Sequence, residues 1–362
     1  MRALFYQSSA HWSGSSRAFS AAARGLAARG DPVTIACREN SGAHEGFLAA
    51  GLDVVGLPAG ESIGGDAWRL RAVLKERFVE AVFLHTEREQ LAVGSAMRLA
   101  ERGAIIRRMR VGSAAALTRS GKLAQYMATT RLLFSTEEDR ARSGAGDQAF
   151  LAPLGVDVSR LENARDASRE ALRISPDTQL IVCAIDKRAG TRLTTPLRTL
   201  ALLAERHPEL RLVLVGRDAD ADDTRMHAAA LGVTSLVRFL GERPDVSQVC
   251  AAADVGWVAA EGDDGAFACL DFMSARVPII ADRSPVVSHF VPDGIAGVLL
   301  PPADPSDTAA TVARFLVDAD TRIAMGKAGH TRARRDFGEA AMIDGFAGAA
   351  NAASDRTLWA AR

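Results

Sequence analysis

The stretch from Val255 to Asp282 reads "VGWVAAEGDDGAFACLDFMSARVPIIAD". It contains two short apolar runs, "VGWVAA" and "VPII", whose length and content are typical of buried strands. Between them lie acidic and small residues, and then a mostly apolar segment that carries one acid, Asp271. Two strands joined by a helix in this way indicate neighbouring parallel strands with the helix packed on the sheet.

The same alternation of strand-like and helix-like segments continues in both directions along the chain. It predicts the α/β class, with doubly wound parallel sheets covered by helices on both faces. Strands are expected at residues 2–9, 32–37, 52–58, 79–85, 104–109, 131–135, 178–185, 210–216, 236–241, 255–260, 277–282 and 297–302. Helices are expected at residues 16–30, 67–78, 89–103, 195–208, 222–233 and 246–254, twice within 307–337, and in the tail.

The alternation is interrupted once, between residues 153 and 167, where Pro153, Gly155 and a polar run indicate a linker. A chain of 362 residues is also long enough for two domains of ordinary size. We therefore expect an N-terminal domain over residues 1–165 and a C-terminal domain over 166–340. The last helix, within residues 341–362, is expected to pack back on the first domain.

Composition limits the classes of function. The chain has 44 basic and 44 acidic residues, and this balance argues against a general nucleic-acid-binding protein. Its four cysteines form no CxxC pair, so neither a zinc site nor a disulfide framework is expected. No apolar run approaches the roughly 18 residues of a membrane span, and the N-terminus lacks the apolar core of a secretory signal. We expect a cytoplasmic protein and leave contact with the inner face of a membrane open.

Doubly wound domains bind ligands at the carboxyl ends of their strands, so residues just after strands are the candidates for a site. After the first strand, Gly14 lies among serines directly before a helix. Glycine lets the backbone approach a ligand, and a helix N-terminus favours anionic groups. The alternative is an ordinary loop in which the serines cap the helix.

A second candidate loop follows the first strand of the C-terminal half and reads "IDKRAGTR". Its Lys187, Arg188 and Arg192 suit a diphosphate, although a solvated loop often carries such residues as well. The next strand ends at Gly216 and is followed by another arginine, Arg217. Basic residues after two successive strands of one domain favour an anion site more than either loop does alone.

Acids and one histidine complete the candidates. Asp271 lies in an apolar segment, where a buried carboxylate needs a basic partner or a ligand. A carboxylate that accepts two hydrogen bonds can bind the diol of a ribose. Asp263 and Asp264 precede the same segment, and both helix capping and substrate binding would explain them. His85 ends a strand; a lone histidine is more often a structural hydrogen-bonding residue than a catalyst.

The second half of the chain resembles a known family over residues 208–333. In order, "LRLVLVG", "LGVTSLVRFLGERPDVSQVCAAADVGWVAA" and "DDGAFACLDFMSARVPIIA" are similar to the donor-binding domain of retaining glycosyltransferases of family four, also called glycosyltransferases group 1. "APLGVDVSRL" resembles the interdomain segment of that family, and "SGSSRAFSAAARGLAARGDPVTIAC" resembles its N-terminal segment. This resemblance implies the GT-B fold, in which two Rossmann-like domains face each other across a cleft.

The resemblance also implies roles for the candidate residues. The family has two glutamates, separated by seven residues, before a "GVP" strand; here these positions are Asp263 and Asp271, and Arg276 replaces the glycine. The first carboxylate would lie near the donor sugar and the second would bind the ribose, with Glu261 as another candidate for the first role. Basic side chains and the glycine loop would bind the diphosphate. For the diphosphate the candidates are Lys187, Arg188, Arg192 and Gly14, and the catalytic candidates are Asp263, Lys187 and Arg188. Gly216 and His85 are further substrate-binding candidates because each ends a strand.

The resemblance thus predicts transfer of a sugar from a nucleoside diphosphate sugar, with retention of anomeric configuration and without a metal or a separate cofactor. The acceptor stays open among a glycan, a lipid and a small molecule. One alternative is a non-catalytic GT-B relative that binds a nucleotide sugar or a protein partner, since both signature glutamates are replaced by aspartates. The other is a dinucleotide-dependent oxidoreductase, against which the missing GxGxxG motif counts.

Overall fold

The computed structural model describes residues 1–60, 62–100, 103–112, 130–186, 191–301 and 305–354. The chain forms two compact units, residues 1–155 with 339–362 and residues 156–338, called unit 1 and unit 2 below. The domain limits expected from the sequence, at residues 165 and 340, lie a short way beyond these. Residues 156–165 belong to unit 2 because their 3₁₀ helix η2 (Val158–Leu161) packs against helices of that unit.

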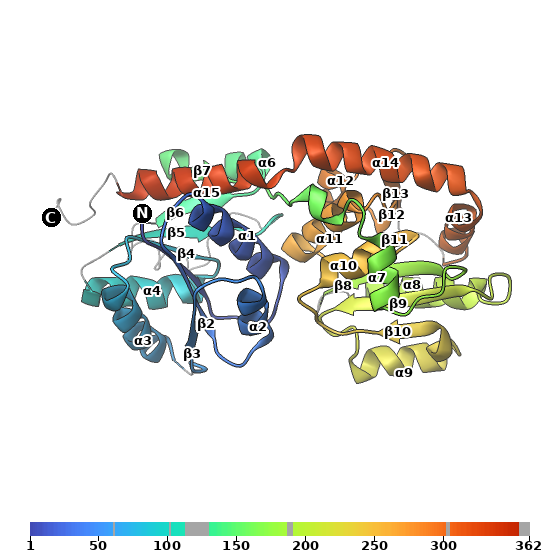
Figure 1. The fold of residues 1–362 in the computed structure, drawn as a ribbon, viewed down its shortest axis with the longest axis horizontal. Coiled ribbons are helices and arrows are strands. Elements are labelled where there is room, and N and C mark those ends of the chain that lie inside the picture. The colour runs from blue at the N-terminus through green and yellow to red at the C-terminus, as the bar shows by residue number, and fades with distance from the viewer. Residues whose placement is uncertain (61, 101–102, 113–129, 187–190, 302–304, 355–362) are drawn as a thin grey trace. The chain divides into compact units, whose positions relative to one another are not determined.

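Unit 1 contains a sheet of seven parallel strands in the order β3-β2-β1-β4-β5-β6-β7 (Figure 1). Its strands are β1 (Ala3–Gln7), β2 (Val33–Arg38), β3 (Val54–Leu57), β4 (Ala81–Leu84), β5 (Ala104–Arg108), β6 (Thr130–Phe134) and β7 (Ala149–Leu151). Its helices are α1 (Gly14–Ala28), α2 (Gly42–Ala49), α3 (Ile63–Glu76), α4 (Glu87–Ala100), α6 (Glu137–Arg142), the 3₁₀ helix η1 (Gly146–Gln148) and α15 (Glu339–Ser354).

Alternating side chains of the buried strands fill two separate cores in unit 1. Leu4 and Tyr6 of β1 lie in a cluster with residues of α3 and α4 on one face of the sheet. Phe5 of the same strand contacts Phe19 of α1 and Phe346 of α15, with ring centroids 5.0 Å and 6.0 Å away. This alternation is what a strand buried on both faces requires, because successive side chains point to opposite sides. The C-terminal helix α15 therefore belongs to the core of unit 1.

Unit 2 contains a sheet of six parallel strands in the order β10-β9-β8-β11-β12-β13. Its strands are β8 (Gln179–Ile185), β9 (Leu210–Gly216), β10 (Val237–Phe239), β11 (Val255–Ala259), β12 (Ile279–Asp282) and β13 (Gly297–Leu300). Its remaining helices are α7 (Arg165–Ala171), α8 (Thr191–Leu203), α9 (Asp222–Ala230), η3 (Thr234–Leu236), α10 (Val246–Ala251), α11 (Gly262–Ser274), α12 (Pro285–Phe290), α13 (Pro305–Val317) and α14 (Ala319–Asp336).

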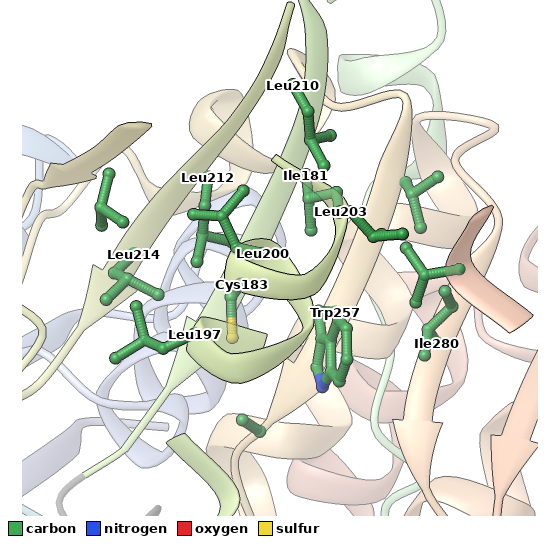
Figure 2. Packing of buried hydrophobic residues seen from close by; sticks show 14 of the residues in the cluster. Ile181, Cys183, Leu197, Leu200, Leu203, Leu210, Leu212, Leu214, Trp257 and Ile280 are labelled. Atoms are coloured by element: carbon green, nitrogen blue, oxygen red, sulfur yellow. The ribbon is translucent and has the colours of Figure 1, made fainter. Parts of the chain in front are cut away.

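One core of unit 2 lies between its sheet and the helices α8, α9 and α13. Figure 2 shows Leu197 and Leu200 of α8 beside Cys183 of β8, with Trp257 of β11 in the same layer. Trp257 is almost fully buried, so its large apolar surface contributes strongly to this core. Helices α10 and α11 pack on β8 from the other face. Both sheets thus have the doubly wound parallel arrangement that the alternating pattern predicts.

The structure differs from the sequence-based expectation at several element limits. Helix α1 begins at Gly14 rather than near residue 16, because the Ser13 side chain accepts a hydrogen bond from the Ser16 N–H and caps the helix there. The short elements α2, α6, α12 and β7 were not expected. The segment predicted as a linker contains η2 and the start of α7, since Val158 and Leu161 are buried against unit 2.

Candidate functional site

The candidate donor residues of unit 2 gather where β8 and β11 end. These two strands are neighbours in the sheet and follow opposite crossover directions, which makes this the topological switch point. Asp186 follows β8 directly, is 6% exposed, and accepts a hydrogen bond from the Glu261 N–H at 3.2 Å. Glu261 is the N-cap residue of α11, so this bond ties the start of α11 to the end of β8.

The two signature carboxylates both lie on α11. Asp263 is in its first turn and is 3% exposed, whereas Asp271 is near its C-terminal end and is 2% exposed. Eight residues of helix separate them by roughly 12 Å along the axis, at ~1.5 Å per residue. One small group therefore could not contact both carboxylates.

Gly216 ends β9 next to the last residue of β8. It has a φ of +120°, and a Cβ built on it would lie 2.1 Å from the carbonyl oxygen of Ile185. Only glycine fits this conformation and this approach without strain. The packing of two strand ends therefore accounts for this glycine.

The basic candidates are only partly described. Lys187 and Arg188 lie outside the described residues. Arg192 is in the first turn of α8, and the structure describes only its backbone position. Helix α8 follows β8 directly in the chain, so its N-terminal turn lies at the same edge of the sheet as Asp186.

Two candidates of unit 1 come together at the matching edge of its sheet. His85 follows β4, is 7% exposed and stacks on Phe19, with ring centroids 3.7 Å apart. Its Nε2 lies 3.2 Å from the carbonyl oxygen of Ser15, the residue after Gly14 in the first turn of α1. The structure thus places the glycine loop and the strand-end histidine next to each other.

Sequence reasoning missed the residue that organises this edge, Glu89. Its carboxylate is buried and accepts hydrogen bonds from the N–H and hydroxyl of Ser8, at 2.7 Å and 2.8 Å. It also accepts from the N–H groups of His85 and Thr86, each at 2.9 Å. Thr86 in turn accepts from the Glu89 N–H at 3.2 Å, which completes a capping box. The spacing of Thr86 and Glu89 before an apolar run is the signal that could have found it.

Sequence reasoning also missed a cavity of about 280 Å³ inside unit 1, at the carboxyl ends of β1, β2 and β3. The loop from Leu57 to Gly60 forms its apolar wall. Its polar lining comes from segments far apart in the sequence, and consists of Tyr6, Gln7, Ser8, Arg38, Asp66 and Arg88. Because these residues come from separate strands and helices, no local motif joins them; only the expected strand order could have indicated their proximity.

Arg276, which replaces the glycine before the "VP" strand, has a φ of +59°. This is the left-handed region, which explains why glycine suits the position. The Arg276 guanidinium forms an ion pair with Glu162 at 2.6 Å. This ion pair connects η2 with the end of α11. It offsets part of the free-energy cost of the left-handed backbone at Arg276.

Metal clusters and membrane-spanning helices are both absent from the described part of the chain. No group of three or more His, Cys, Asp or Glu residues there could hold a metal ion. None of the helices in the described ranges has the length and apolar character needed to cross a membrane.

Sequence comparison finds relatives of the second half of the chain. Residues 165–332 match the family described as glycosyl transferases group 1. The D-inositol 3-phosphate glycosyltransferase of Corynebacterium jeikeium is 31% identical over 192 residues, which are 49% of this chain and 45% of that protein. The sulfoquinovosyl transferase SQD2 of Arabidopsis thaliana is 27% identical over 195 residues, 52% of this chain and 37% of that protein. The chain spans about half the length of the curated relatives it matches.

Structure comparison covers nearly the whole chain. HepE from Anabaena, solved in complex with UDP and glucose, superposes with a TM-score of 0.77 over 97% of this chain and 100% of that one, at 15% identity. At this identity the likeness establishes the fold, and it confirms the expected GT-B class for the two parallel-sheet units. Residues 165–332 therefore match the model of glycosyl transferases group 1, in a chain that has the GT-B fold.

Proposed function

We propose that this protein is a retaining glycosyltransferase of family four that transfers a hexosyl group from a nucleoside diphosphate sugar. The observation that supports this most directly is the group 1 match over residues 165–332, which contains the helix with both signature carboxylates. Asp263 and Asp271 lie on that one helix at 3% and 2% exposure.

In this proposal Asp271 binds the ribose diol and Asp263 lies near the donor sugar. The separation of the two along α11 fits the two ends of a nucleotide sugar. Glu261, the N-cap residue of α11, is the second candidate for the sugar side. Lys187, Arg188 and Arg192 are assigned to the diphosphate, together with the backbone near Gly216.

The chemistry follows from the charges that develop. Cleavage of the sugar–phosphate bond places positive charge on the anomeric carbon and negative charge on the leaving diphosphate. Fixed cationic side chains and the α8 N-terminus would stabilise the diphosphate, and we propose that they do so without a metal. The acceptor oxygen bonds to the anomeric carbon on the face that the diphosphate leaves, and its proton passes to the leaving phosphate.

Relatives suggest what the substrates are. HepE has been solved with UDP and with UDP-glucose, and the names of matched relatives include D-inositol 3-phosphate and sulfoquinovosyl transfer. We propose a uridine diphosphate sugar as the first donor to test. We place the reaction in the cytoplasm, and contact with the inner face of the membrane belongs to the same proposal.

The test of the proposed function is donor hydrolysis followed by proton NMR. Many transferases slowly hydrolyse a donor when no acceptor is present, and the anomeric coupling of the fresh sugar reports its configuration. We expect the α-anomer of glucose to appear first from UDP-α-glucose, and Asp263→Asn to slow its release. Appearance of the β-anomer first would contradict retention, and no turnover with any UDP-, GDP- or ADP-sugar would favour a non-catalytic GT-B protein.

A further inference from the structure

Helices α3 and α4 lie side by side on one face of the unit 1 sheet (Figure 1). Their inner sides are buried, and Leu70 of α3 and Met97 of α4 belong to the same core cluster. Their outer sides carry large apolar side chains: Trp68 of α3 is 66% exposed, and Leu99 of α4 is 53% exposed. This helix pair therefore presents apolar surface to solvent.

Arg71 connects the two exposed apolar residues. Its guanidinium lies 5.3 Å from the centroid of the Trp68 ring, and its Nε donates a hydrogen bond to the Leu99 carbonyl at 3.3 Å. These contacts place the tryptophan of α3 next to the C-terminal end of α4. Trp12 and Trp257, the other tryptophans in the described ranges, are partly and fully buried. Trp68 differs from them because most of its ring is exposed.

Basic side chains surround this apolar surface. Lys75 is exposed and lies about two turns after Trp68 on the same side of α3. Arg98 is exposed in the last turn of α4, directly before Leu99. These two residues, together with Trp68, Arg71 and Leu99, are called the α3–α4 surface below. It combines exposed apolar side chains with cations from both helices.

The acidic side chains of both helices lie away from the α3–α4 surface. In α3, Asp66 is buried, and Glu76 projects ~100° around the helix axis from Lys75. In α4, Glu87 and Glu89 belong to the first turn, which lies ~15 Å or more along the axis from Leu99. The charge that α3 and α4 contribute to this surface is therefore positive.

This composition distinguishes between two kinds of partner. Exposed tryptophan and leucine beside lysine and arginine are typical of a helix at a lipid–water boundary. The indole ring lies at the level of the headgroups, and long basic side chains reach anionic lipids. The core of a protein–protein interface is instead depleted of charged residues, and lysine is depleted from such interfaces as a whole. The α3–α4 surface therefore fits an anionic bilayer better than it fits a protein partner.

We infer that the α3–α4 surface binds an anionic lipid bilayer. Trp68 and Leu99 lie among the lipid headgroups, Lys75 and Arg98 contact lipid phosphates, and Arg71 positions the Trp68 ring. The inference rests on the proposed function and deepens it, because it names the surface and the lipid charge that the proposed membrane contact requires.

Co-sedimentation of the intact protein with lipid vesicles tests the lipid charge. Vesicles of phosphatidylcholine and phosphatidylglycerol should bind about tenfold or more tightly than vesicles of phosphatidylcholine alone. The physical reason is that each basic residue close to an anionic membrane strengthens binding about fivefold. Because salt screens this attraction, a higher salt concentration should weaken the binding.

Two pairs of variants test the surface itself. Trp68→Ala should weaken binding to the anionic vesicles about tenfold, whereas Met226→Ala should retain it, since Met226 is 61% exposed on α9 of unit 2. Lys75→Gln should weaken binding about fivefold, whereas Lys327→Gln, at an exposed lysine of α14, should not. All four positions are exposed, so thermal unfolding should show folded proteins.

Equal binding of neutral and anionic vesicles, or undiminished binding by Trp68→Ala, would overturn the inference. A dimer that Trp68→Ala dissociates, found without any vesicle binding, would also overturn it, because the surface would then join two copies of the chain. Donor hydrolysis by the same samples separates this inference from the proposed transfer. Hydrolysis without vesicle binding would contradict only the lipid surface, and vesicle binding without hydrolysis of any donor would contradict only the transfer.

Discussion

The second strand along the chain is β2 in unit 1 and β9 in unit 2, and these two strands end in different ways. The first four strands of the two units nevertheless have the same order in their sheets. In unit 1, β2 ends at Arg38, whose side chain lines a cavity. In unit 2, β9 ends at Gly216, where the backbone of β8 leaves no space for a Cβ. The same topology therefore provides a side-chain-lined pocket in one unit and close backbone packing in the other. The carboxyl edge at the second strand is therefore lined by side chains in unit 1 and by closely packed backbone in unit 2.

Within each unit, a different carboxylate links the loops at the switch point of that unit's own sheet. In unit 1, Glu89 comes from helix α4 and links the end of β1 to the end of β4 through four hydrogen bonds. In unit 2, Asp186 comes from the end of β8 itself and accepts the N–H of Glu261 beyond β11. A buried acid at this point orders the loops that follow the strands, and the variants below test how each unit depends on its own arrangement.

The largest effect is expected for Gly216→Ala. The new Cβ would lie 2.1 Å from the Ile185 carbonyl oxygen, so the β8 or β9 end must shift, and we expect unit 2 to lose about 3–4 kcal/mol of unfolding free energy. Urea unfolding followed by tryptophan fluorescence would measure it. Gly232→Ala is the matched control, because Gly232 has a φ of +71° but no atom within 4 Å of the position that its Cβ would take. Equal losses in both variants would show that close packing at Gly216 is unimportant.

A somewhat smaller loss is expected for Glu89→Gln. The amide nitrogen would replace one acceptor oxygen and face N–H donors, so we expect a loss of about 2–3 kcal/mol in unit 1. The exposed Glu138→Gln on α6 should change the stability by less than about 0.5 kcal/mol. Hydrogen exchange of the loops after β1 and β4 would locate the change, and unchanged exchange there would contradict the organising role of Glu89.

The third-largest expected effect is a difference of about 1 kcal/mol in unfolding free energy between Arg276→Gly and Arg276→Ala. Both variants lose the ion pair with Glu162, but only glycine removes the cost of the left-handed backbone. We expect the glycine variant to be the more stable of the two by thermal unfolding. If alanine were equally stable, backbone strain at the end of α11 would not explain why the position favours glycine.

The smallest effect concerns pH and Asp293, which precedes β13. The pKa of Asp293 is held below its ordinary value, first by the hydrogen bond from the Leu299 N–H at 2.9 Å and then by Arg283. A lowered folded-state pKa stabilises the protein above the unfolded pKa of ~3.9, and this stabilisation is lost as the pH falls below it. Because this side chain is 39% exposed, screening limits the effect to a few tenths of a kcal/mol. Asp293→Asn should reduce the decrease in the unfolding free energy of unit 2 between about pH 5 and pH 3 by that amount. An unchanged pH profile of the unfolding free energy would contradict this.

Patterns along the chain were sufficient for most of the architecture. Alternating apolar runs predict both parallel sheets, because strands buried on both faces and their covering helices leave strong local signals. Short elements such as α2 and β7 were missed, since a helix of one or two turns depends on its cap more than on periodicity. The helix start at Gly14 likewise depends on the hydroxyls of Ser13 and Ser16 rather than on the apolar pattern.

Sequence reasoning could predict only part of the candidate site. Asp263 and Asp271 lie on one helix and were singled out by the resemblance to the family signature. Arg38, and the contact of Glu89 with Ser8, were missed because they depend on strands that are distant in sequence and adjacent only in the folded sheet. Residues that act through local spacing can be read from one chain, whereas residues that act across the strand order need the structure.

The most direct test of the account is the affinity for a UDP-sugar measured by calorimetry in two variants. We predict that Asp271→Asn weakens donor binding by about tenfold or more, since it replaces an acceptor for the ribose diol. Arg38→Gln should leave the donor affinity unchanged, with thermal unfolding showing that both variants are folded. Retained affinity in Asp271→Asn, or an equal loss in Arg38→Gln, would contradict the assignment of the donor to unit 2.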